Sequence, residues 1–170
     1  MNEQTAISRE QLEYSQGAKD FLARKPQLFI GGEWVESSHG KTLAVEDPSC
    51  GREVARIVDA STDDVDRAVA AARAAFDDGR WSDLPPMKRE ATIHRLADLI
   101  QREAELLAEL EAIDNGKPKT MAQAVDVNGA VSMLHYHAGW ASKLSGEMIE
   151  PANAPRGVFH SYTRREPVGV

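Results

Sequence analysis

The sequence contains one cysteine, Cys50, among its 170 residues. A single cysteine excludes an internal disulfide and a metal site built from clustered thiolates. No apolar run approaches the roughly 20 residues that span a bilayer. Residues 1–20 are polar and have no apolar signal-peptide core. The formal net charge of −7 makes nucleic acid and anionic membranes unfavourable partners. We therefore expect a globular protein of the cytoplasm.

Familiar catalytic motifs are also missing. The chain has no G-x-G-x-x-G and no G-x-x-x-x-G-K-[ST] phosphate-binding loop. Cys50 follows Asp47-Pro48-Ser49 in a turn sequence and has no adjacent histidine to generate a thiolate. His135 and His137 are two residues apart, so on a helix they point to different faces and do not share a metal. The sequence predicts no self-contained active site.

A strong helical pattern occupies the middle of the chain. Apolar residues recur at steps of three and four: Ile93, Leu96, Ile100, Ala104, Leu107 and Leu110. Ser82 or Asp83 is predicted to cap this helix, and Gly116 to end it in a left-handed conformation. A break near Glu103 is expected because about thirty residues is long for a globular helix. A second helix is predicted over residues 119–143.

The N-terminal half carries strand signals. Residues 28–30 and 33–35 read as two short strands around a Gly-Gly turn. Residues 42–46 and 53–58 read as a second pair, joined by the turn at residues 47–51. This pattern predicts two antiparallel hairpins.

A further helix is predicted after Ser61, whose hydroxyl suits the capping position. Its expected buried stripe consists of Val65, Ala68, Val69, Ala72 and Phe76. Gly79 is expected to end it. In the later helix, Asp126 and Asn128 interrupt small and apolar residues, and we expect both to form hydrogen bonds to a neighbouring element.

The C-terminal part alternates in the manner of a strand. Residues 158–167 follow this pattern, after the short segment Glu147-Met148-Ile149-Glu150. A strand pair with an exposed edge favours pairing with another chain. The pattern therefore predicts an assembly arm in place of a catalytic site.

Taken together, the blocks resemble a known family. In order they are FIGGEWVES with GKTLAVEDPSCGREVARI, DVDRAVAAARAAFDDGRW, HRLADLIQRE with LAELEAIDNGKP, YHAGWASKLSGEMIE and SYTRREPVGV. Residues 28–170 resemble the N-terminal third of the aldehyde dehydrogenase superfamily. They are most similar to the NAD(P)-dependent enzymes of the betaine-aldehyde and phenylacetaldehyde type.

The resemblance implies an α/β fold and a division of the chain. Residues 1–27 would be a polar lead-in and residues 28–145 the N-terminal part of a cofactor-binding, Rossmann-like domain. Residues 146–167 would form oligomerisation strands of a dimer or tetramer. Residues 168–170 would be a truncated entry to the rest of the cofactor domain.

The resemblance also implies an activity: oxidation of an aldehyde to a carboxylic acid with NAD or NADP. In the family a cysteine thiolate attacks the aldehyde, a glutamate activates water and an asparagine stabilises the oxyanion. These residues lie beyond the region that this chain matches, and Cys50 does not match the nucleophile. We therefore expect no catalytic and no cofactor-binding residue here, and no cofactor bound by this chain alone. The alternative is an inactive truncated product that serves only as a structural or assembly module.

A few residues can be matched to roles in the family. Asp114, with a backbone carbonyl near Glu46, matches a structural site for a monovalent cation, although a helix cap and a strand end are the first explanation of these two residues. Val125 and Gly129 match a helix face that borders the substrate tunnel, although Gly129 also suits close helix packing. The residues that match the oligomerisation strands are Met148, Ile149, Phe159, Tyr162 and Arg164.

Overall fold

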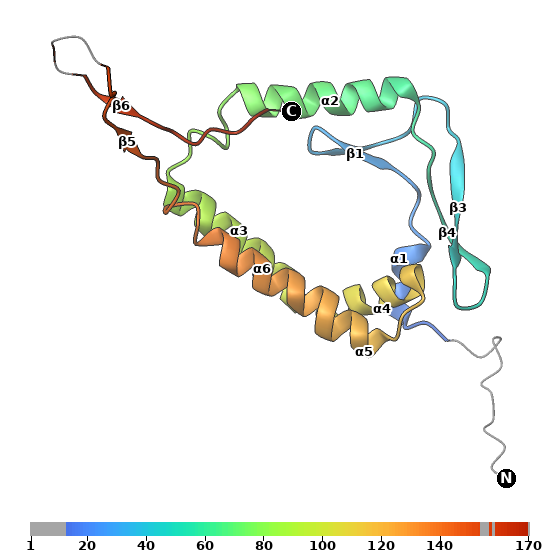
Figure 1. The fold of residues 1–170 in the computed structure, drawn as a ribbon. Coiled ribbons are helices and arrows are strands. Elements are labelled where there is room, and N and C mark those ends of the chain that lie inside the picture. Colours follow the sequence, from blue (N-terminus) through green and yellow to red (C-terminus); the bar gives the residue numbers. More distant parts are fainter. Residues whose placement is uncertain (1–12, 154–156, 158, 170) are drawn as a thin grey trace.

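The computed structural model describes residues 13–153, 157 and 159–169. Its elements, in chain order, are α1 (Gln16–Leu22), β1 (Leu28–Ile30), β2 (Glu33–Val35), β3 (Thr42–Asp47), β4 (Arg52–Val58), α2 (Thr62–Asp77), α3 (Pro86–Arg102), α4 (Ala104–Asn115), α5 (Lys119–Met121), η2 (Ala122–Val127), α6 (Asn128–Ala138), β5 (Met148–Ile149) and β6 (Ser161–Tyr162). In Figure 1 they form an open frame, with α2 along one side and β1 next to it, β3 and β4 along a second side, and α3 beside α6 along the third. Within the described residues, no helix combines the length and hydropathy needed to cross a membrane.

Both predicted hairpins are confirmed. Strands β1 and β2 pair antiparallel, and Gly31 and Gly32 supply the positive φ angles of 63° and 90° that their turn requires. Strands β3 and β4 pair from Thr42 opposite Val58 to the turn, with a bulge between Val45 and Glu46. Each strand of this second hairpin is one residue longer at the turn than the pattern indicated.

The long helical pattern divides where it was expected to. Glu103 leaves helical geometry, with φ −97° and ψ 14°, and separates α3 from α4. Gly116 ends α4 in the left-handed conformation, with φ 79°. The expected cap by Ser82 or Asp83 is wrong. Pro85 occupies that position without a side-chain hydrogen bond, and prolines at the helix start leave fewer N–H groups to be capped.

The second predicted helix is shorter and less regular than expected. It begins at Lys119 as predicted, but residues Ala122–Val127 form a π-helix, η2, whose turns are wider than those of an α-helix. The following helix α6 ends at Ala138 instead of near residue 143. Asp126, on η2, accepts a hydrogen bond of 2.6 Å from Lys117, which confirms the expectation for Asp126. Asn128 accepts a hydrogen bond from the Ser132 hydroxyl through its backbone carbonyl only, within the described residues. Wide turns of this kind are frequent at functional sites.

The buried core is small and built largely from alanine. The fully or nearly buried apolar residues are Ala18, Ala97, Ala104, Ala108, Ile113, Ala122, Val127, Val131 and Ala138. The tryptophans Trp34, Trp81 and Trp140 are instead 67%, 44% and 44% exposed. Aromatic residues contribute most to ordinary cores, so the described elements enclose only part of one.

The stripe predicted to be buried on α2 is exposed, which corrects the sequence interpretation. Val65 and Val69 are 50% and 53% exposed, and only Phe76 of the stripe is half-buried. The hydrophobic period of the helix was read correctly, but periodicity shows only that a face is apolar. The three-residue strand β1, which packs on α2, is too short to cover that face.

The exposed area supports the same conclusion for the whole chain. The chain exposes 13338 Å², whereas a compact monomer of this length exposes about 8,200 Å². Even in a fully extended form, the residues outside the described part would supply at most about 2,700 Å² of that difference. The frame itself therefore leaves a large surface uncovered, and this surface includes apolar side chains such as Val65 and Val69.

Candidate functional site

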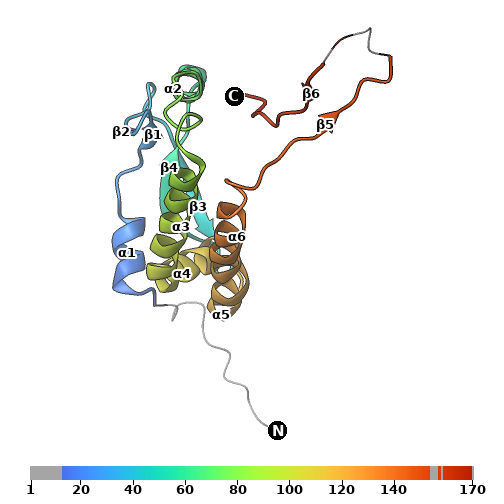
Figure 2. The same cartoon turned by 90° about the vertical axis from the view of Figure 1, so that its left-hand side faces the viewer.

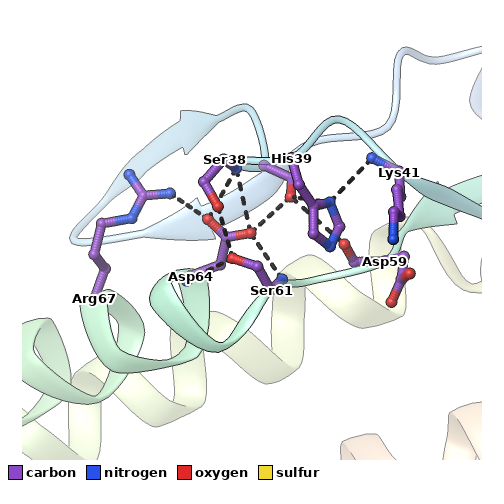
Figure 3. A network of polar contacts seen from close by, with 8 residues as sticks. Ser38, His39, Lys41, Asp59, Ser61, Asp64 and Arg67 are labelled. Carbon is purple, nitrogen blue, oxygen red and sulfur yellow. Dashed lines mark hydrogen bonds and ion pairs between the residues drawn. The ribbon is translucent and has the colours of Figure 1, made fainter.

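A polar network holds the start of α2 against the loop after β2 (Figure 3). The carboxylate of Asp64 accepts hydrogen bonds from the Ser37 hydroxyl at 2.6 Å, the Ser61 N–H at 3.0 Å and the Ser38 N–H at 3.1 Å, and pairs with Arg67 at 2.7 Å. Asp64 is 1% exposed. The Ser37 and Ser61 hydrogen bonds, with Arg67, outweigh burial and hold the pKa of Asp64 well below its usual range.

This network is structural. Ser61 and Asp64 complete a reciprocal capping box, with the Asp64 N–H donating to the Ser61 hydroxyl at 3.1 Å. The N-terminus of α2 therefore already holds an anion, its own carboxylate. A phosphate group of a dinucleotide would meet repulsion at this end.

A second polar cluster lies where the β3–β4 turn meets the end of α4. Asp47, 2% exposed, accepts from the Tyr14 hydroxyl at 2.7 Å and from the Ser49 N–H and hydroxyl at 2.8 and 2.6 Å. Burial raises the pKa of Tyr14 to about 12, with the Asp47 hydrogen bond acting in the same direction. Burial opposes ionisation of Asp47, but the bonds from Ser49 and Tyr14 keep its pKa below the usual value.

The two residues matched to a cation site lie beside this cluster. Glu46 is on β3 opposite Glu53, and Asp114 is in the last turn of α4, which packs on β3. Both side chains are exposed, and the buried carboxylate of this region is Asp47. In the described part of the chain, no three His, Cys, Asp or Glu residues are grouped as metal ligands.

The residues matched to the substrate tunnel lie on one exposed, apolar face. Val125 on η2 is 58% exposed, and Met133 on α6 is 60% exposed. Gly129 lies between them in the chain, and a methyl group added there would meet no atom within 4 Å. Within the described residues, Gly129 therefore does not serve close helix packing. The face is apolar, and at Gly129 it has no side chain, which leaves open space between Val125 and Met133.

The residues matched to oligomerisation form a projecting arm (Figures 1 and 2). Met148 pairs with Tyr162, and Ile149 with Ser161, in a two-stranded antiparallel ladder. The exposed fractions are 80% for Met148, 48% for Ile149, 49% for Phe159 and 73% for Tyr162, and the Arg164 side chain is 77% exposed. Strand pairing is observed at Ser161–Tyr162, a shorter ladder than residues 158–167 suggested, and Val158 lies outside the described residues.

The remaining nucleophile candidate lies in a turn, as predicted. Cys50 is half-buried and accepts a hydrogen bond of 3.3 Å from the Arg52 Nε. The structure also brings together His94 and His135, which sequence reasoning did not pair. The spacing of Glu90, His94 and Asp98 at every fourth residue indicates that they share one helix face. It does not predict His135 as a partner, because His135 is 41 residues from His94 in the sequence.

Comparisons with known proteins agree with this arrangement. Residues 34–170 match the sequence pattern of the aldehyde dehydrogenase family. An aldehyde dehydrogenase of Aspergillus niger is 44% identical over 143 residues, which cover 84% of this chain and 28% of that protein. The structure of an aldehyde dehydrogenase from Bacillus cereus with NAD+ superposes with a TM-score of 0.84 at 38% identity, covering 92% of this chain and 31% of that one.

A betaine aldehyde dehydrogenase from Staphylococcus aureus superposes with a TM-score of 0.74 at 33% identity, over 81% of this chain and 27% of that one. The chain thus spans less than a third of the length of these relatives. The fold is that of the corresponding part of an aldehyde dehydrogenase, as the sequence resemblance implied. The family pattern covers most of the chain, and the chain therefore belongs to the aldehyde dehydrogenase family.

Proposed function

We propose that this chain is the N-terminal portion of an NAD(P)-dependent aldehyde dehydrogenase that oxidises an aldehyde to a carboxylic acid, with the catalytic groups outside this chain. The observation that carries the proposal is the family match over residues 34–170. The unpartnered apolar surface of the frame supports it, because a face such as Val65 and Val69 on α2 needs further chain to cover it.

The cofactor, when bound, would supply the hydride acceptor. The N-terminus of α2 does not suit a dinucleotide phosphate, because its capping box already places the Asp64 carboxylate there. We therefore assign no step of the reaction to residues of this chain. Its role is to provide the N-terminal part of the cofactor domain, residues 28–145, including its outer helices. Residues 168–170 would lead from this chain into the rest of that domain.

Within such an enzyme, Val125 and Gly129 would form one wall of the substrate tunnel. The support is their position on an exposed apolar face, with open space over Gly129. Glu46 and Asp114 would contribute to a monovalent cation site where α4 meets β3. Residues 146–167 would form the assembly arm of a dimer or tetramer, supported by the exposed Met148 and Tyr162.

Complementation tests the proposal. The chain is co-expressed with the part of the Bacillus cereus relative that it does not cover, and NADH formation is followed with NAD+ and phenylacetaldehyde. We expect the two parts to co-purify and to form NADH together, whereas neither part is active alone. Cys50→Ser is the matched control and is expected to leave the complemented activity unchanged.

Two results would contradict the proposal. The first is failure of the two parts to associate. The second is turnover by the isolated chain that disappears in Cys50→Ser, which would make Cys50 the nucleophile.

A second candidate function is an inactive structural or assembly module. The projecting β5–β6 arm favours it, because its apolar residues are free to pair with another copy. This candidate predicts a defined oligomer of the isolated chain that Tyr162→Lys dissociates. It also predicts no association with the downstream part of a relative, which separates it from the first proposal.

A further inference from the structure

Two histidines from different helices meet at the contact between α3 and α6. The Nδ1 atoms of His94 and His135 are 2.7 Å apart, and the ring centroids are 5.0 Å apart at an interplanar angle of 32°. The two helices lie side by side in both views (Figures 1 and 2). At that distance one Nδ1 carries the proton and donates it to the other.

Each ring also faces a carboxylate with its second nitrogen. The Nε2 atom of His94 is 3.8 Å from Glu90, and the Nε2 atom of His135 is 3.7 Å from Asp98. Histidines that bind metals usually donate the N–H of the free nitrogen to a carboxylate, which orients the ring. At 3.7–3.8 Å these contacts are longer than hydrogen bonds, so a rotation of the rings or of the carboxylates must complete the two outer hydrogen bonds of such an arrangement.

We propose that His94 and His135 form a binding site for a transition-metal ion of the zinc type, held by the two Nδ1 atoms and bridging α3 and α6. Zinc–nitrogen bonds of about 2.0–2.1 Å at a tetrahedral angle place the two nitrogens about 3.3 Å apart. The rings must therefore separate by roughly 0.6 Å. Both side chains are partly exposed, at 39% and 41%, so a small rotation is sufficient.

Metal binding by the two Nδ1 atoms requires no proton to leave the pair of imidazole rings. The ring that carries its proton on Nδ1 in the free pair carries it on Nε2 in the bound pair, where Glu90 or Asp98 accepts it. Both ligands are then neutral imidazoles, which favour Zn²⁺, Cu²⁺ or Ni²⁺ over Ca²⁺ and Mg²⁺. Two protein ligands leave positions open to water, so the site binds more weakly than a structural zinc site with four protein ligands.

Calorimetric titration of the whole chain with Zn²⁺ at neutral pH tests this proposal. We expect saturable binding of one ion per chain. His94→Gln and His135→Gln should each weaken it by about tenfold or more, and Asp98→Asn by about tenfold, through loss of ring orientation. His137→Gln is the matched control, because this exposed histidine lies only two residues from His135 on α6. It is expected to bind as the wild type does.

A measurement on the wild type alone guards against variants that misfold. Zinc should shift the proton resonances of two of the five histidine rings, and Ca²⁺ and Mg²⁺ should shift none. The proposal is overturned by an absence of saturable binding, or by a loss in His137→Gln equal to that in His135→Gln. Neither assay contains an aldehyde or a nicotinamide, so its outcome is independent of the enzyme proposal.

Discussion

At Asp64, one buried carboxylate joins segments that are far apart in the chain. Its partner Ser37 lies 27 residues earlier, in the loop after β2, whereas Ser61 and Arg67 belong to α2 and its cap. The capping role of Ser61 was readable from its place before a helical pattern. The contribution of Ser37 could not be predicted from the sequence, because nothing in the local sequence indicates which loop folds over the start of a helix.

The Asp64 network should make the stability of the chain depend on acid. The pKa of Asp64 is lower in the folded than in the unfolded state, where it is about 3.9. Its stabilisation is therefore complete at neutral pH and is lost as the pH falls below about 4 toward the folded value. Urea denaturation of the chain in association with the downstream part of a relative, followed by circular dichroism, should show a smaller change in stability between pH 7 and pH 3 in Asp64→Asn than in the wild type.

Asp63→Asn is the control for this change, because Asp63 is an exposed acid in the same helical turn. It should keep the pH dependence of the wild type. If Asp64→Asn also kept it, Asp64 would not be the group that acid releases.

At the scale of elements, two glycines in helical segments have opposite roles. Gly116 ends α4 with φ 79°, and an added Cβ would lie 2.9 Å from the Pro48 Cγ. Gly129 is within α6, and an added Cβ would meet nothing within 4 Å. Position and conformation, more than the residue type, therefore decide what a substitution does.

Alanine at these two positions should change stability in opposite directions. Gly116→Ala is expected to destabilise by about 1–2 kcal/mol, because a left-handed alanine is strained and its methyl group crowds Pro48. Gly129→Ala is expected to stabilise α6 by about 0.5–1 kcal/mol through helix propensity. Hydrogen exchange of the α4 and α6 amides measures both. A loss of protection in Gly129→Ala would mean that this glycine is needed for packing after all.

At the scale of the whole molecule, the elements are local and their common core is incomplete. The hairpins hold together through their own ladders, and α4 packs on η2 through Ala104, Ala108, Ala122 and Val127. Large side chains such as Trp34, Met133 and Trp140 remain exposed. Residues of this kind in other proteins supply most of the hydrophobic stabilisation.

The isolated chain is therefore expected to bind a hydrophobic reporter dye and to melt without a sharp transition. Adding the downstream part of a relative should reduce dye binding, because that part would cover the apolar faces. Fluorescence of the dye and calorimetry measure the two effects. A monomer of this chain with a sharp cooperative melt would contradict the expectation.

The sequence by itself determined the two hairpins, the places of the main helices and the family. The Gly31-Gly32 turn and the helix end at Gly116 follow from backbone preferences, which act over a few residues, and the break at Glu103 follows from the length of the helical pattern. Only the tertiary structure decided which faces are covered and which distant side chains meet. The α2 face at Val65 and Val69 is exposed, and His94 reaches His135, because burial and pairing depend on elements that other parts of the chain bring together.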